Sequence, residues 1–254
     1  MATVERYMIL DGELLTQQHL EGAYIYQNIH TLNYQPRHVE HHVRILQSLA
    51  QELFGIECDY SAAKITAMIQ LLLERVRPTR QRSIRAVVKQ YASGSYTIEC
   101  DAPSLYQGYT VRSLRPEVAT MRITLPLDIY PTSAAVATRQ VADSIARSRD
   151  FHTALLMGDD EQIYCEATCP IALVHERRLL LSPMPYSVEQ RLLEQAAQKA
   201  GIQIEKRPIC REDILRADEV LIADWQGISA AQHVDGKQYM AIIAERLARE
   251  IEKL

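Results

Sequence analysis

The chain of 254 residues is long enough to bury the core of one large domain or of two smaller ones. Hydrophobic residues make up 47% and charged residues 24% of it, which is the composition of a globular protein and excludes a disordered chain. The formal net charge is −4 at pH 7, with acidic and basic residues mixed along the chain, so we expect no binding to nucleic acid.

The sequence also argues against membrane and secreted classes. It contains no apolar run of the roughly 18 residues that a membrane span requires, so we expect no membrane association. Acidic residues interrupt the first 15 positions, which is not the pattern of a secretion signal. The five cysteines are scattered and form no CxxC pair. We therefore predict a reduced, cytoplasmic protein.

The first half of the chain predicts strands around two helices. Asp11-Gly12 lies between two short apolar runs and is typical of a hairpin turn. One helix should end at Gly55, and the next at Pro78. The predicted elements, in chain order, are a hairpin over 7–15, a strand over 22–32, helices over 38–55 and 61–77, and strands over 83–92, 95–102 and 109–114.

The second half predicts a separate α/β unit. Residues 115–131 contain three prolines and no helical period, which indicates a connection between domains. Ser187 and Gln190 have the spacing of a capping box at a helix start. The elements expected after the connection are helices over 133–148 and 188–201 and from 240 onward, and strands over 153–158, 170–174, 177–183, 202–209 and 218–225. We predict an α/β fold with an α+β domain at 1–116, a connection at 117–131 and an α/β domain at 132–254.

Two groups of possible metal ligands are weak. His38, His41 and His42 lie on neighbouring faces of a predicted helix, where two imidazoles could share a zinc ion, but no third ligand is evident. In a strand, Cys165 and Cys169 would share one face, opposite to the residue between them at 166. We interpret them as core thiols and expect no metal site.

Glu166 stands out because it lies between two apolar segments, "TALLMG" and "PIALV". A carboxylate there loses hydration, so it needs a cation, a hydrogen-bond donor or a raised pKa. Five segments around it occur in a characteristic order: "EHHVRIL", "SIRAVV", "TALLMGDDEQIYCEATCPIALV", "LLLSPMPYSVEQRLLEQAAQKAGI" and "ILRADEVLIADWQGISAAQHVDG". Together they resemble the class IV aminotransferase family, the pyridoxal-phosphate fold of branched-chain aminotransferases, D-amino-acid aminotransferases and aminodeoxychorismate lyases.

The resemblance implies a pocket between two domains, a homodimer and pyridoxal phosphate as cofactor. Glu166 matches the family glutamate that faces the pyridine nitrogen and keeps it protonated. Arg44 matches the arginine that holds the cofactor phosphate, for which a guanidinium is well shaped. Ser187 and Val188 match the turn whose amides meet the phosphate at a helix N-terminus. From the residues alone, Arg44 is interpreted as a solvated helix residue and Glu166 as a partner in a structural salt bridge.

Substrate contacts are expected on the first domain. Arg85 resembles a family arginine near the substrate carboxylate, and we assign Tyr26 to the same role; a plain surface position is the alternative for Arg85. Arg85, Val87 and Lys89 are spaced two residues apart, so in a strand their side chains lie on the same face. If that face is turned toward the ligand, Lys89 supplies an amine; otherwise it ends an exposed sheet edge.

The family's Schiff-base lysine has no counterpart at the expected place. The matching position in "PTSAAVATRQ" is Ala135, or Ala134 if the register shifts by one, and no lysine occurs from residue 90 to residue 198. Arg139 cannot replace it, because a guanidinium does not deprotonate near neutral pH. Glu189 adds a negative charge where the resemblance puts the phosphate, and Trp225 stands where a small hydroxyl residue is expected.

Three hypotheses follow for function. The first is a degenerate family member that performs no transamination and has a binding, regulatory or structural role. The second is an active pyridoxal-phosphate aminotransferase or lyase that uses Lys89 or holds its cofactor without a covalent bond. The third is a protein that binds a different small anionic ligand through Arg44 and Arg85.

Overall fold

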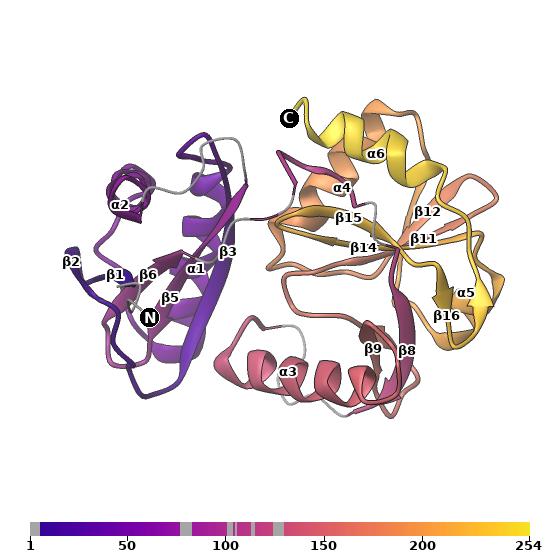
Figure 1. Cartoon of the computed structure of the whole chain (residues 1–254), viewed down its shortest axis with the longest axis horizontal. Coiled ribbons are helices and arrows are strands. Elements are labelled where there is room, and N and C mark those ends of the chain that lie inside the picture. The colour runs from indigo at the N-terminus through magenta and orange to yellow at the C-terminus, as the bar shows by residue number, and fades with distance from the viewer. Residues whose placement is uncertain (1–5, 77–82, 101–103, 105, 113–114, 124–129) are drawn as a thin grey trace, which may run out of the picture. The chain divides into compact units, whose positions relative to one another are not determined.

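The computed structural model describes residues 6–76, 83–100, 104, 106–112, 115–123 and 130–254. The chain divides into two compact units, Met1–Gly108 and Tyr109–Leu254, which we describe separately (Figure 1). Part of the segment predicted as a connection, 117–131, forms a strand of the second unit.

The first unit is a six-stranded sheet with two helices, in the strand order β2-β1-β6-β5-β3-β4. Neighbouring strands are antiparallel throughout. Its elements are β1 (Tyr7–Leu10), β2 (Glu13–Thr16), β3 (Tyr24–Leu32), β4 (Gln35–Pro36), α1 (Val39–Phe54), α2 (Ala62–Val76), β5 (Ile84–Tyr91) and β6 (Tyr96–Cys100).

Local sequence explains the limits of these elements. The predicted hairpin is confirmed: β1 and β2 pair around Asp11 and Gly12, both of which have positive φ. Helix α1 ends at Gly55, whose φ of 66° is left-handed and favours glycine. Ser61 caps α2 by accepting a hydrogen bond from the Lys64 amide. Pro78, the predicted end of this helix, lies outside the described residues.

The sheet of the first unit has two different faces. Helices α1 and α2 pack on the face that carries Ile25, Ile29 and Ile98, which are fully buried. On the same face, His42 of α1 lies 2.8 Å from the Gln27 side chain. Burial lowers the pKa of His42 to about 3, so its imidazole is neutral. His42 is therefore a core residue of this unit.

The second unit contains two sheets, with strand orders β10-β9-β8-β16-β17 and β13-β12-β11-β14-β15-β7. The strands are β7 (Thr110–Val111), β8 (Glu117–Arg122), β9 (Thr153–Met157), β10 (Ile163–Tyr164), β11 (Ile171–His175), β12 (Arg178–Leu181), β13 (Ile204–Lys206), β14 (Glu219–Asp224), β15 (Gly227–Ala230), β16 (His233–Val234) and β17 (Lys237–Gln238). The helices are α3 (Ser133–Arg147), α4 (Val188–Lys199), α5 (Arg211–Arg216) and α6 (Ile243–Ile251).

Helix α3 lies against the sheet formed by β8 and β9, and α4 packs with α6 beside the other sheet (Figure 1). The inner face of α3 presents Ala142 and Ala146, which are fully buried and let the helix approach the strands closely. Thr132 caps α3 by accepting a hydrogen bond from the Ala135 amide.

Two predicted elements differ in the structure. The strand-like run at 109–114 yields β7, which pairs in parallel with β15 of the second unit and not with the sheet of the first; Ser113 and Leu114 lie outside the described residues. Residues 117–122 of the expected connection form β8, between β9 and β16. Both results depend on pairing with strands more than 30 residues away, which no local pattern encodes.

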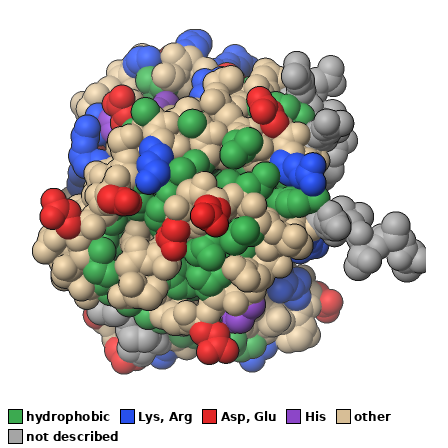
Figure 2. All heavy atoms as spheres, turned by 90° about the vertical axis from the view of Figure 1, so that its left-hand side faces the viewer, with side chains coloured by type: hydrophobic (Ala, Val, Ile, Leu, Met, Phe, Trp, Pro, Cys, Tyr) green, Lys and Arg blue, Asp and Glu red, His purple; other side chains and the backbone are tan. Residues whose placement is uncertain are grey.

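Apolar side chains also reach the surface. The large exposed ones include Leu71 and Val76 of α2, which are 46% and 43% exposed. Figure 2 shows hydrophobic side chains gathered between acidic and basic ones on one face of the molecule. No helix in the described part of the chain has the length and hydropathy needed to cross a membrane.

Candidate functional site

Arg44 lies on the solvent side of α1. Its side chain is exposed, and it lines an open hollow of about 370 Å³ together with Glu40, Gln47 and Ser61. Ser61 belongs to the start of α2, so one end of the hollow is a helix N-terminus. The first unit thus presents a cationic side chain beside a cavity, with Glu40 as an opposing charge.

Arg85, Tyr26 and Lys89 share the face of the sheet that α1 and α2 do not cover. In the β3–β5 register, Tyr26 is opposite Lys89 and His30 is opposite Arg85, and directly opposite residues project to the same side. The expected alternation of Arg85 and Lys89 onto one strand face is found in the structure, and Tyr26 of β3 lies on the same face. Tyr26 is buried, whereas Arg85 and Lys89 are half-buried.

The Lys89 amine is held by a carboxylate. Its Nζ donates to Glu99 Oε1 of β6 at 2.7 Å and lies 5.4 Å from the centre of the Tyr24 ring. Burial by itself lowers the pKa of Lys89, but the hydrogen bond and the charge of Glu99 outweigh it and raise that pKa above its usual value. The amine is consequently protonated and is a poor nucleophile at neutral pH.

Glu166 belongs to a tight turn and not to a strand. The Cys169 amide donates to the Glu166 carbonyl at 2.8 Å, and the pair forms an isolated bridge after β10. The half-buried carboxylate accepts from Thr168 Oγ1 at 3.4 Å and from Cys169 Sγ at 3.6 Å. A cavity of about 20 Å³ beside Glu166 has room for about one water molecule. Local donors thus contribute to stabilising this carboxylate.

The expectation that Cys165 and Cys169 share a strand face is wrong in its geometry, because the turn begins at Glu166. Both are nonetheless core residues, in contact with the apolar cluster of the second unit. Burial raises the pKa of both thiols. In the described part of the chain, no group of three or more histidine, cysteine, aspartate or glutamate side chains is placed to hold a metal ion.

Ala135 lies in the first turn of α3 and is 8% exposed, whereas Ala134 is exposed. Arg139, one turn later on the same side of the helix, lies 3.6 Å from Cys165 Sγ through its Nη1. The face of α3 that carries Ala135 therefore adjoins the segment of Glu166. Arg139 also forms two hydrogen bonds with Asp143 and donates to the Ala154 carbonyl, which is a structural network.

Ser187 begins α4, as predicted. Its Oγ accepts from the Gln190 amide at 3.2 Å, while the Gln190 side chain donates to Glu194, so the cap is confirmed without the reciprocal contact of a capping box. Ser187 Oγ also donates to the Thr168 carbonyl at 2.9 Å, which ties the start of α4 to the turn of Glu166. Val188 is buried at the first helical position.

Glu189 is the second residue of α4 and is 3% exposed. Burial raises the pKa of its carboxyl to about 8, and the negative charges of Asp224 and Glu166 add to the rise. Asp224 ends β14 and pairs with Arg112 at 2.8 Å. The start of α4 is thus surrounded by carboxyl groups from two other segments.

Trp225 is buried in the two-residue turn between β14 and β15. The turn ends at Gly227, whose φ is 128° and where any Cβ atom would collide with the Thr110 carbonyl oxygen of β7. Only glycine allows β7 to approach β15 this closely. The expected small hydroxyl side chain is therefore replaced by a buried indole next to Asp224.

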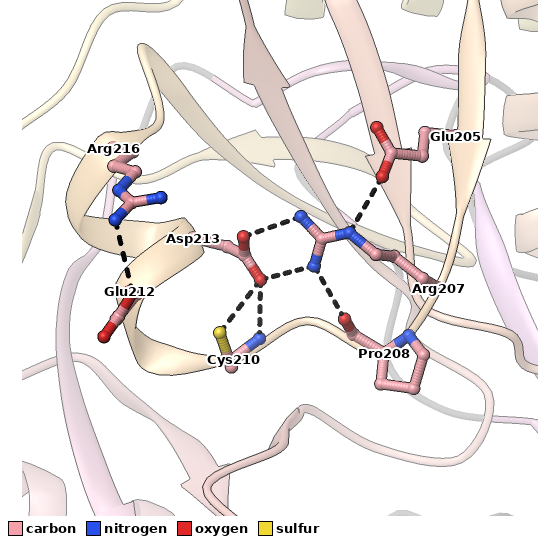
Figure 3. A network of polar contacts seen from close by, with 7 residues as sticks. All are labelled: Glu205, Arg207, Pro208, Cys210, Glu212, Asp213 and Arg216. Carbon is pink, nitrogen blue, oxygen red and sulfur yellow. Dashed lines mark hydrogen bonds and ion pairs between the residues drawn. The ribbon is translucent and has the colours of Figure 1, made fainter.

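A separate polar network lies at the start of α5 (Figure 3). Arg207 donates to both carboxylate oxygens of Asp213 at 2.8 Å, and Asp213 Oδ2 accepts from the Cys210 amide at 2.9 Å. Arg207 Nε also donates to Glu205 at 2.8 Å. This network caps a short helix, and its cation is already engaged by two carboxylates, so we assign it to stability.

The chain has the fold of the pyridoxal-phosphate aminotransferases of class IV. The family model for amino-transferase class IV matches residues 25–224, and the chain belongs to that family. A search of curated proteins found no match. Among solved structures, the chain is similar to the branched-chain aminotransferase of Thermoproteus uzoniensis, with 15% identity, a TM-score of 0.81, and coverage of 98% of this chain and 94% of that one.

Two further structures show the same fold. An aminotransferase from Brucella abortus bound to the cofactor PLP has 13% identity and a TM-score of 0.80, with 98% of each chain covered. A proposed 4-amino-4-deoxychorismate lyase of Legionella pneumophila has 14% identity and a TM-score of 0.78, with 91% of each chain covered. The expected α/β fold and family resemblance are confirmed.

Two polar residues of the second unit, Arg112 and Thr168, were not predicted from the sequence. Arg112 follows β7 and is brought to Asp224 by the pairing of β7 with β15. Thr168 contributes its carbonyl to Ser187 and its hydroxyl to Glu166. Neither belongs to a motif, and only the long-range pairing of strands and the turn geometry reveal them.

Proposed function

We propose that this class IV family member performs no transamination and acts by binding a small ligand. The observation that carries the proposal is the side chain at the start of α3, where the family resemblance expects a lysine. Ala135 presents a buried methyl group there, on the helix face that adjoins the Glu166 segment. A methyl group can neither form an imine nor carry a proton between atoms of a substrate.

The lysines of the chain support this interpretation. There are six: Lys64, Lys89, Lys199, Lys206, Lys237 and Lys253. Lys89, the substitute considered from sequence, is bound to Glu99 and has a raised pKa. Lys206 pairs with Glu194, and Lys237 donates to backbone carbonyls of the second unit. An imine-forming amine must lose its proton, which the contact of Lys89 with Glu99 opposes.

The residues of the second unit also fit poorly with the cofactor that the family binds. Pyridoxal phosphate carries a phosphate, and a helix N-terminus is a favourable place for it. The start of α4 instead contains buried Glu189, with Asp224 and Glu166 adding negative charge. The start of α4 therefore does not suit the phosphate of this cofactor.

The ligand we expect carries a carboxylate. Arg85 and Tyr26 share the sheet face that the helices leave uncovered, and a guanidinium suits a carboxylate through two parallel hydrogen bonds. Arg44 offers a second cation beside its own hollow. We retain a homodimer and a cytoplasmic location as predictions, and light scattering of the purified protein would test the first.

Borohydride trapping tests the loss of imine chemistry. The purified protein is incubated with pyridoxal or pyridoxal phosphate, reduced and mapped by peptide mass spectrometry. We expect no adduct at a unique lysine and no transamination of common amino acids. Turnover that Lys89→Ala abolishes would overturn the proposal in favour of an active enzyme with a relocated amine.

A matched pair of variants tests the assigned position. Ala135→Lys places an amine on the inner face of α3, and Ala134→Lys places the same amine on its exposed side. We expect a reducible adduct with pyridoxal at residue 135 only in the first variant. Equal labelling in both variants would show that residue 135 has no special access to the ligand.

A further inference from the structure

The hydrogen bonds at the start of α4 give the Glu189 carboxyl group little support. Ser187 Oγ donates to the Thr168 carbonyl at 2.9 Å and accepts from the Gln190 amide at 3.2 Å. The same oxygen lies 3.4 Å from Glu189 Oε2. A hydroxyl has one proton and two lone pairs, and a carbonyl only accepts. Because the serine proton is directed to the Thr168 carbonyl, the longer contact with Glu189 gives an ionised carboxylate little stabilisation.

The surroundings of Glu189 agree with a neutral carboxyl group. Its side chain is 3% exposed, and its Oε1 has no hydrogen-bond partner among the described residues. The charged groups that act on it are Asp224 of β14 and Glu166 of the turn after β10, and Arg112 pairs with Asp224. An ionised Glu189 would be a buried anion next to two other carboxylates, which is costly.

The Glu189 side chain also occupies space at the start of α4. The first backbone amides of an α-helix attract anions, because their N–H groups have no intrahelical partner and the helix dipole is positive there. At α4, the Glu189 side chain turns back to Ser187, the N-cap, and fills the space next to these amides. A phosphate would have to displace a buried side chain and then lie beside Asp224 and Glu166.

We propose that Glu189 is a specificity-determining residue that blocks the start of α4 and excludes phosphate-bearing ligands, so that the protein binds ligands without a phosphate group. This deepens the proposed function and rests on it for the assumption that α4 faces the ligand.

Pyridoxal and pyridoxal phosphate are suitable probes because they differ only in the phosphate. Affinities are measured by calorimetry at neutral pH for the wild type, Glu189→Thr and Glu189→Gln, with inorganic phosphate as a third titrant. Threonine opens the space and adds a hydroxyl, whereas glutamine keeps the volume of the neutral acid. Glu212→Gln, at an exposed position, controls for the loss of a carboxylate.

For the wild type we expect no gain in affinity from the phosphate group. Glu189→Thr should bind pyridoxal phosphate at least about tenfold more tightly than pyridoxal, as one or two amide–phosphate hydrogen bonds predict. Glu189→Gln should behave like the wild type. If the wild type binds pyridoxal phosphate more tightly than pyridoxal, the proposal is overturned, even if Glu189→Thr does not fold. A folded Glu189→Thr variant that binds both aldehydes equally would also overturn it.

The two proposals fail in distinguishable ways. A reducible adduct on a wild-type lysine contradicts the loss of imine chemistry, whichever aldehyde forms it. The affinity ratio between the two aldehydes reports only on the block at α4. A wild type that forms an adduct equally with both aldehydes would keep the role of Glu189 and refute the loss of imine chemistry.

Discussion

Replacing Glu189 by glutamine should remove a pH-dependent loss of stability from the second unit. Burial and the charges of Asp224 and Glu166 raise the pKa of the Glu189 carboxyl from 4.5 to about 8 in the folded protein. A carboxyl whose pKa is higher in the folded than in the unfolded state holds its proton more tightly when folded. Its effect is therefore a stability that is present at low pH and lost as the pH rises from about 4.5 to about 8.

The magnitude follows from the same values. One pKa unit corresponds to about 1.36 kcal/mol, so the rise from 4.5 to about 8 allows a loss of up to roughly 5 kcal/mol. Local relaxation and water entry reduce this figure, and we expect a few kcal/mol. Glutamine has the shape of the protonated acid and does not ionise, so the variant should not show this loss.

Urea denaturation followed by tryptophan fluorescence measures the unfolding of the second unit, which contains Glu189. Trp225 is the single tryptophan and is buried next to Asp224 in the second unit. The free energy of unfolding of Glu189→Gln, relative to the wild type, should increase by a few kcal/mol between about pH 5 and about pH 9. Glu212→Gln, at an exposed site, should show no such increase.

A difference between Glu189→Gln and the wild type that stays constant over this pH range would refute the reasoning. It would mean that Glu189 ionises in the folded protein as easily as in the unfolded chain. It would also mean that the Ser187 hydroxyl supports the Glu189 carboxylate more strongly than their 3.4 Å contact indicates.

The remaining predictions concern stability and can be measured by urea denaturation. Gly227→Ala should cost at least about 2 kcal/mol, because its Cβ would meet the Thr110 carbonyl and its φ of 128° disfavours alanine; a neutral effect would mean that β7 does not lie against β15. Asp213→Asn should cost about 1 to 2 kcal/mol near neutral pH. Arg207 and the Cys210 amide lower the pKa of Asp213 below its usual value of 3.8. The difference in unfolding free energy between Asp213→Asn and the wild type should therefore shrink as the pH falls below 3.8. A difference that persisted in acid would contradict the ion pair. His42, whose pKa falls to about 3 on burial, should make the first unit less stable as the pH drops below 6.5; His42→Gln should reduce this loss, as circular dichroism at acidic pH would show.

Several features of the fold could be predicted from local sequence. The hairpin at Asp11-Gly12 and the end of α1 at Gly55 depend on backbone conformations that few residues adopt, so they are visible in the sequence. The cap of α4 at Ser187 likewise depends on neighbours within three residues. Family membership was predictable because it rests on the order of whole segments, and the match over residues 25–224 confirms it.

The candidate site was only partly predictable. Strand alternation correctly placed Arg85 and Lys89 on one face, because the period of two is a local property. It could not show that Lys89 is bound by Glu99, since that contact depends on the register between β5 and β6. The sequence suggested a strand around Glu166, where the structure has a turn closed by Cys169.

The sequence by itself determined which chemical groups are available: an alanine at position 135, and a glutamate where the family resemblance expects a phosphate. Tertiary structure decided the state of those groups. Burial in the folded unit raises the pKa of Glu189 to about 8, and β14 and the Glu166 turn add to the rise by bringing the charges of Asp224 and Glu166 close. Burial and electrostatic energy are sums over neighbours in space, and in this protein those neighbours come from segments far apart in the chain.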